Sequence, residues 1–245
     1  TFSHAGGENR RNLASVSAST GQVSAWNPGA SDAVLGLAVH GSTVVAGGQF
    51  SILGGKDRAR IAEFDARTGT ATSWNPGADN LVLTLAVGGS SVYAGGDFTH
   101  IGGQARSRIA ALDATSGLAT SWNPDASSSV TSIAVGGNAV YVGGNFNRIG
   151  GQDRGGIAAL RASDGSAAAW NPGANELVRT IVVRGSTIYV GGDFTTIGGR
   201  DRHGLATLDA NTGMATAWNP DPNGVVYAIE PKGSTVYVGG YFSRI

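Results

Sequence analysis

Five tryptophans stand at a constant spacing along this chain of 245 residues. They occupy positions 26, 74, 122, 170 and 218, so each lies 48 residues from the next. A fixed period between about 20 and 50 residues is typical of solenoids, propellers and other repeat arrays. The spacing therefore predicts five copies of one structural unit and excludes a domain built around a single irregular core.

Within each copy, glycine pairs separate short apolar and β-branched runs, and the copy that ends at Trp122 is representative. Residues 81–87 are almost continuously apolar, which predicts a strand buried on both faces. A tight glycine turn then leads to a β-branched and aromatic strand at 91–98. We expect a third strand at 108–113, after a longer loop, and a short fourth strand that ends at the tryptophan.

Four antiparallel strands in about 40 to 50 residues make one propeller blade, and the helical period of 3.6 residues is missing. The sequence therefore predicts an all-β fold, a five-bladed β-propeller forming one domain over residues 1–245. We expect the N-terminus to supply the third and fourth strands of the last blade and the C-terminus its first and second strands, in a two-plus-two closure. The expected blade units are 27–74, 75–122, 123–170, 171–218, and 219–245 closed by 1–26.

Charge and composition exclude several classes of partner. The 17 basic residues balance 17 acidic ones, which argues against nucleic acid as a partner, because nucleic acid binds to clusters of positive charge. Apolar residues make up 41%, without an apolar run of the roughly 18 residues that a membrane span needs. Cysteine is absent, and the chain begins at Thr1 in the middle of a repeat. We expect a monomer without membrane insertion that is part of a larger chain.

The strand order places the longer loops, such as 99–107, on one face of the predicted propeller, and binding residues concentrate on such loops. The candidate ligand-binding residues are Arg58, Arg106, Arg154, Arg202, His100, Gln104, Asp97 and Asp193. The arginine recurs in every copy, Arg10 included. It could donate to an anion or a sugar, but a residue that every blade requires is more often one that holds the blade together, through loop carbonyls or a tryptophan ring.

Two further repeated features have both a functional and a structural interpretation. The Trp-Asn-Pro sequence could stack on a sugar, although packing of the tryptophan in the space between blades is the simpler interpretation. The position shared by Gln49, Asp97, Asn145 and Asp193 could surround calcium, although hydrogen bonds that cap turns are the simpler interpretation. Asp65, Asp113 and Asp209 share another position, where we expect them to start turns. We predict neither a cofactor nor a metal.

The sequence lacks the patterns of the common catalytic sites. None of the four histidines belongs to a metal-binding pair, and a Gly-x-Ser-x-Gly sequence is absent. A glycosidase needs two carboxylates that converge. The four glutamates, Glu8, Glu63, Glu176 and Glu230, stand at four different positions of the repeat, and we place Glu63 and Glu230 within strands. We therefore predict no catalytic residues and a chain that is not an enzyme.

The repeat is clearest from Val140 to Pro172 and from Ile188 to Pro220. It reads Val-Tyr-Val-Gly-Gly-Asp/Asn-Phe-x-x-Ile-Gly-Gly-x-x-Arg, followed by Ile-Ala-x-Leu-Asp and Trp-Asn-Pro. This pattern resembles the bacterial delta-60-type β-propeller repeats of unknown function and is similar to the kelch-like repeats of the fungal cortical polarity marker. The resemblance covers the whole chain and implies a propeller, usually part of a larger secreted or surface-attached protein. Val45, Arg161 and Pro231 depart from the pattern.

The sequence thus predicts a non-enzymatic, extracellular recognition module, secreted or on the surface of a bacterium, that binds a glycan or a protein surface. Two alternatives stay open. One is a structural spacer or scaffold of a larger surface protein, and the other is a carbohydrate-active enzyme. Architecture does not decide among them, because one fold hosts many functions.

Overall fold

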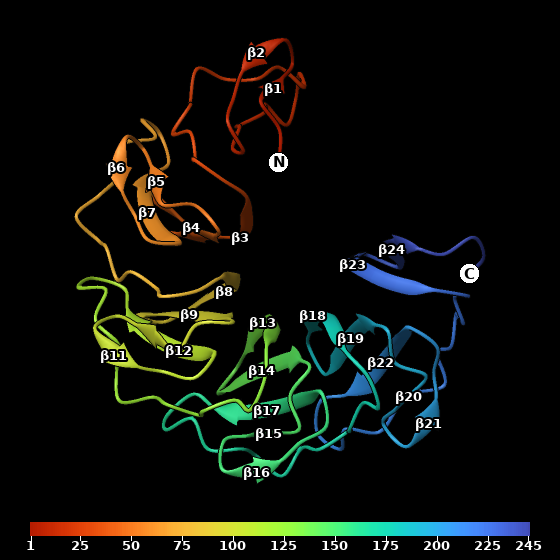
Figure 1. Ribbon diagram of the computed structural model, residues 1–245. Coiled ribbons are helices and arrows are strands. Elements are labelled where there is room, and N and C mark those ends of the chain that lie inside the picture. The colour runs from red at the N-terminus through yellow and green to blue at the C-terminus, as the bar shows by residue number, and fades with distance from the viewer. The chain divides into compact units, whose positions relative to one another are not determined.

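The computed structural model describes residues 1–245, and its secondary structure consists of β-strands and turns (Figure 1). No helix in it has the length and apolar character that crossing a membrane would require. The chain separates into two compact units, Thr1–Thr120 and Ser121–Ile245. The same order of elements recurs in both units with the period of the tryptophans, which confirms the all-β repeat predicted from the sequence.

Each repeat contains an antiparallel sheet. Its first strands are β3 (Val34–His40), β8 (Val82–Gly88), β13 (Val130–Gly136), β18 (Val178–Arg184) and β23 (Val225–Lys232). Its second strands are β4 (Thr43–Gly48), β9 (Ser91–Gly96), β14 (Ala139–Gly144), β19 (Thr187–Gly192) and β24 (Thr235–Tyr241). Its third strands are β7 (Ile61–Asp65), β12 (Ile109–Asp113), β17 (Ile157–Arg161) and β22 (Leu205–Asp209). The second strand lies between the first and the third, as the predicted order requires.

The fourth strand predicted in each copy is reduced to a single β-bridge, such as Leu112 with Ala119. Two backbone hydrogen bonds of 2.9 Å flank this bridge. The carbonyl oxygen of Thr120, one residue further, accepts a hydrogen bond of 2.6 Å from the Arg106 guanidinium. Because the arginine side chain donates to the carbonyl that would otherwise extend the pairing of the third and fourth strands, the repeat has a three-stranded sheet with one bridged segment at its edge.

The segment predicted as a long loop contains a small hairpin. The five hairpins are β1–β2 (His4–Ala5, Glu8–Asn9), β5–β6 (Ile52–Leu53, Lys56–Asp57), β10–β11 (His100–Ile101, Gln104–Ala105), β15–β16 (Arg148–Ile149, Gln152–Asp153) and β20–β21 (Thr196–Ile197, Arg200–Asp201). Each turns on a glycine pair with positive φ, a backbone conformation that glycine adopts without steric cost. The hairpin gives this part of the repeat a fixed shape that the sequence analysis missed.

The glycine pair at the end of each second strand allows two close approaches. A Cβ atom on Gly144 would lie 2.2 Å from the Ser129 carbonyl oxygen, so the backbone just before β13 occupies that space. A Cβ atom on Gly143 would lie 2.6 Å from a methyl group of Val178, which belongs to the next repeat. The predicted role of these glycines as sites of close approach is confirmed.

The tryptophans join successive repeats. Trp74 is 3% exposed, and its indole Nε1 donates to the Asp113 carbonyl of the next repeat at 3.0 Å. The same bond, 39 residues along the chain, recurs from Trp26, Trp122 and Trp170. Trp170 also packs edge-on against the ring of Tyr141. The structural interpretation of the tryptophan, packing between blades, is therefore the one observed.

The two ends of the chain lie in different units. In the first unit, residues 12–26 form a single β-bridge, between Val16 and Val23. They contain no strand of two or more residues. In the second unit, β23 and β24 form a two-stranded sheet, whereas the sheets of the other repeats have three strands. The five-bladed ring and its closure by the two ends stay predictions.

Candidate functional site

At one end of the sheets, the small hairpin of a repeat meets the connection that follows the preceding tryptophan, and we call this end the loop face. The tight turns between first and second strands lie at the opposite end, which we call the turn face. On the loop face, Asp79 fixes hairpin β10–β11. Its carboxylate accepts the N–H groups of Thr99 at 2.8 Å and His100 at 3.0 Å, and the Thr99 hydroxyl at 2.5 Å. Burial acts to raise the pKa of Asp79, but the hydrogen bonds from Thr99 and His100 outweigh it and hold that pKa well below its ordinary value.

The same anchoring position recurs five residues after every tryptophan. Its oxygen accepts two backbone N–H groups at distances of 2.8 to 3.1 Å, at the start of the hairpin in four repeats and at Ser243 and Arg244 in the last. The anchoring residues are Ser31, Asp79, Ser127, Asn175 and Asn223. This position was not predicted from the sequence. Its signal is the repeated choice among Ser, Asp and Asn, the residues whose short side chains bond to nearby backbone.

The recurrent arginine holds the end of the hairpin to the bridged segment. The Arg58 Nη1 donates to the Asp57 carbonyl at 2.8 Å and its Nη2 to the Thr72 carbonyl at 2.5 Å, and the residue is 8% exposed. The remaining arginines make the same two bonds, and the Nε of all five is buried without a hydrogen-bond partner; they are Arg10, Arg106, Arg154 and Arg202. The geometry is that of a clamp within the repeat.

Other candidate ligand-binding residues lie on or near the loop face. His100 and Gln104 are exposed on the two strands of one hairpin, and the His100 Nδ1 lies 3.3 Å from the Asp79 carboxylate. Asp97 is partly buried just after β9. Asp193 accepts two hydrogen bonds from Arg179, at 2.5 and 2.8 Å, which raise the pKa of that guanidinium. No three acidic, histidine or cysteine side chains gather where one metal ion could bind them.

The second unit contains a pocket of about 430 Å³ on its loop face, between the last two repeats. Phe194, Pro222 and Val225 give it an apolar part, and polar side chains also line it. Among these, the His203 Nδ1 lies 2.7 Å from the Asp221 carboxylate. Asp193, a residue predicted from the sequence, lines this pocket, but the pocket itself was not predicted, because Gly204 and Asp221 stand at positions where the repeats differ in residue type.

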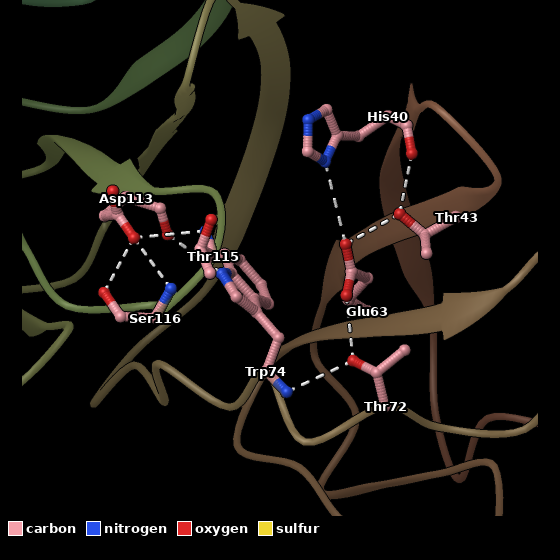
Figure 2. A network of polar contacts seen from close by, with 8 residues as sticks. All are labelled: His40, Thr43, Glu63, Thr72, Trp74, Asp113, Thr115 and Ser116. Atoms are coloured by element: carbon pink, nitrogen blue, oxygen red, sulfur yellow. Dashed lines mark hydrogen bonds and ion pairs between the residues drawn. The ribbon is translucent and has the colours of Figure 1, made fainter.

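One buried acid lies outside these sites. Glu63, on β7, accepts hydrogen bonds from the hydroxyl groups of Thr43 at 2.7 Å and Thr72 at 2.9 Å, and His40 lies 3.9 Å away (Figure 2). The Thr72 hydroxyl in turn accepts the backbone N–H of Trp74. Glu63 lies within a strand, as predicted, and both of its carboxylate oxygens are taken by side chains of its own repeat.

Comparisons with known proteins agree with this repeat architecture. The chain is similar to the computationally designed Ika8 protein, at 17% identity and a TM-score of 0.57, over 90% of this chain and 72% of that one. It is also similar to the designed Ika4 protein, at 18% identity and a TM-score of 0.52, over 74% of this chain and 93% of that one. BamB from Moraxella catarrhalis matches at 21% identity and a TM-score of 0.53, over 84% of this chain and 56% of that one. A search of the curated proteins finds no match.

At such identities, the likeness to BamB shows a fold, the β-propeller. The closer resemblance to delta-60-type or kelch-like repeats stays a prediction. A family model gives the decisive match, because it covers residues 3–172, more than half of the chain, and its description is "Outer membrane protein assembly factor BamB". The chain belongs to this family.

Proposed function

We propose that this chain is a non-enzymatic recognition module that binds its partner through the loop face. The observation that carries the proposal is that repeated positions stabilise the fold, whereas one exposed position of the repeat varies in residue type. Residues that recur in every repeat, such as Arg58 and Trp74, form hydrogen bonds within and between repeats. The first hairpin position varies freely and is exposed; it holds His4, Ile52, His100, Arg148, Thr196 and, at the end of the chain, Arg244. Varied side chains on a rigid support are typical of binding surfaces.

A protein surface is the ligand class that we favour over a glycan. The family description names an assembly factor for outer membrane proteins, which is a role in contacts between proteins. The same description supports a location in the cell envelope, of which a secreted or surface-attached state is the finer form that we propose. The candidate ligand residues His100 and Gln104 then contact the partner, whereas the arginine clamps support the hairpins from beneath.

We also propose that the five repeats close into one ring. Within the second unit, the Gly191 position receives a methyl group of Val226 from the following repeat. The equivalent pair across the ends of the chain is Gly239 and Val34. A Cβ atom on Gly239 would meet only Ala228 of its own sheet, and Leu37, beside Val34, is 55% exposed. Each unit thus presents one half of the contact that joins successive repeats elsewhere.

A photo-crosslinking amino acid tests the loop face in cells that produce the full protein. Placed at Gln104, on the hairpin, it should form discrete adducts with one or few proteins. Placed at Ser90, in the tight turn on the turn face of the same repeat, it should form none of these adducts. Equal adducts from both positions would contradict a loop-face partner. No adducts, together with no saturable binding on glycan arrays, would favour a structural spacer.

The absence of an enzymatic activity has its own test. Polysaccharides and their oligomers are incubated with the chain, and reducing ends are measured. We expect no turnover, because no two glutamates share a position in the repeat. Turnover that disappears in Glu8→Gln or Glu176→Gln would overturn the proposal and favour a carbohydrate-active enzyme.

A further inference from the structure

One loop-face position carries a side chain in the first three repeats and none in the last two. It is the residue two after the clamp arginine, and it has positive φ in every repeat: Asn12, Arg60, Arg108, Gly156 and Gly204. Positive φ favours glycine and strains the backbone of most other residues. Side chains at this position in the first three repeats must therefore contribute a contact that offsets this strain.

In the first unit, that contact is a hydrogen bond to the next repeat. The Arg60 Nη1 donates to the carbonyl oxygen of Ala78 at 3.0 Å, and in the preceding repeat the Asn12 Nδ2 donates to the Ala30 carbonyl at 3.1 Å. In the last repeat, the equivalent carbonyl belongs to Pro222, which is buried, and Gly204 has no side chain to reach it. The arginine and its hydrogen bond are both missing there.

The pocket of about 430 Å³ lies where this arginine is missing, and both Gly204 and Pro222 line it. A second substitution gives it negative charge. Asp221 replaces the glycine that stands at 29, 77 and 173, and it keeps the positive φ of that position, at 57°. Its carboxylate lines the pocket beside His203. The buried residue Pro222 has a carbonyl to which no hydrogen bond is made, and only one oxygen of the Asp221 carboxylate lies against His203. Together these acceptors form a site for a group with several N–H donors and a positive charge.

We propose that this pocket binds a guanidinium group, supplied by an arginine side chain of a partner protein. The bound group occupies the place that Arg60 takes in its own repeat, donating to the Pro222 carbonyl and lying near the Asp221 carboxylate. Asp193 also lines the pocket, but Arg179 already neutralises it. Arg244 lies at the exposed rim, where solvent weakens its repulsion of a bound cation. The inference rests on the proposed recognition function and names the chemistry that this part of the loop face recognises.

A titration followed by ¹H–¹⁵N NMR tests the pocket without the partner. The probes are N-acetyl-arginine methylamide and its citrulline analogue, which has the same shape without the charge. We expect the arginine probe to shift the backbone amides of 203–205 and 223–225 in a saturable way. The citrulline probe should bind at least about tenfold more weakly, because it lacks the charge-assisted hydrogen bonds of the guanidinium.

Three variants show whether the response comes from this pocket. Gly204→Arg introduces the residue of the second and third repeats and should abolish the response. Gly156→Arg makes the same change one repeat earlier and should leave it intact. A Cβ atom on Gly204 would lie 2.7 Å from the Gly224 carbonyl oxygen, so Gly204→Arg requires a local shift. Asp221→Gly, which restores the residue of three other repeats, should weaken the arginine probe about tenfold without that shift.

Three results would overturn the proposal: no shifts at these amides, equal affinity for the two probes, or an unchanged response in both Gly204→Arg and Asp221→Gly. Crosslinking from Gln104 separates this outcome from a failure of the proposed function. If the adducts persist while the pocket fails to bind the arginine probe, the loop face is a recognition surface and the guanidinium assignment is wrong. If the adducts are absent while the probe binds, the guanidinium site is supported and the proposed recognition function of the loop face is contradicted.

Discussion

At the scale of single residues, the recurrent arginine shows how a repeated residue serves the fold. Arg58 is buried and donates to two carbonyls that are 15 residues apart along the chain. Removing it leaves these carbonyls without their donor and opens a cavity. We expect Arg58→Ala to lower the free energy of unfolding by about 2 to 4 kcal/mol.

The matched control is Arg148→Ala. Arg148 is exposed, and its guanidinium lies 3.9 Å from the Asp153 carboxylate, so this change should cost less than about 1 kcal/mol. Chemical denaturation of both variants measures the two values. If Arg58→Ala lowered the free energy of unfolding no more than Arg148→Ala does, the clamp would have no structural role. That result would favour the anion- or sugar-binding interpretation of the arginine.

At the scale of elements, the turn after each third strand depends on a carboxylate. Asp113 accepts the backbone N–H and the hydroxyl of Ser116 and the N–H of Thr115, and these bonds hold its pKa below the ordinary value of 3.8. A depressed pKa in the folded state stabilises the fold above the unfolded pKa, and this stability is lost as the pH falls through the folded value.

We therefore expect Asp113→Asn to melt at a lower temperature than the wild type at pH 7, and the difference to shrink as the pH falls below about 4. Asp57→Asn, which removes an exposed carboxylate with no hydrogen bond in the structure, controls for the loss of one negative charge. Melting curves followed by circular dichroism at several pH values give the comparison. A difference for Asp113→Asn that did not change with pH would contradict this role of the carboxylate.

Strands and turns could be predicted from the sequence because their signals are local and periodic. Apolar runs and glycine turns gave β8 and β9 to within two residues, and Asp113 was expected to start its turn. The hairpin β10–β11 was missed, because strands of two residues are too short to show alternation. The fourth strand was over-predicted, since sequence reasoning could not foresee that the Arg106 guanidinium takes the Thr120 carbonyl.

At the scale of the whole molecule, the candidate binding site shows the limit of periodic reasoning. Repetition identified the arginine clamps and the tryptophans, which hold the repeats together. The pocket instead arises where Gly204 and Asp221 depart from the pattern, and its shape depends on a side chain that other repeats have and this one lacks. Which departures lie next to one another depends on how the strands pack in space, and a linear sequence does not display that packing.

The five repeats account for one closed ring if the contact between Val34 and Gly239 forms as its equivalents do. The chain has no cysteine, so the double variant Val34→Cys with Gly239→Cys reports on that contact directly. Gly143→Cys with Val178→Cys is the control, because a Cβ atom on Gly143 would lie 3.2 Å from the Val178 Cβ, so that a small shift reaches the roughly 3.5 to 4.5 Å of a disulfide.

After mild oxidation, the disulfide is mapped by digestion and mass spectrometry on chain that elutes as a monomer. Ring closure predicts that Val34→Cys with Gly239→Cys forms an intramolecular disulfide as completely as the control pair does. Two results would contradict the closed five-bladed propeller. One is a disulfide in the control pair alone, and the other is a Val34→Cys with Gly239→Cys variant whose monomer fraction keeps both thiols free while its disulfide appears only in a covalent dimer.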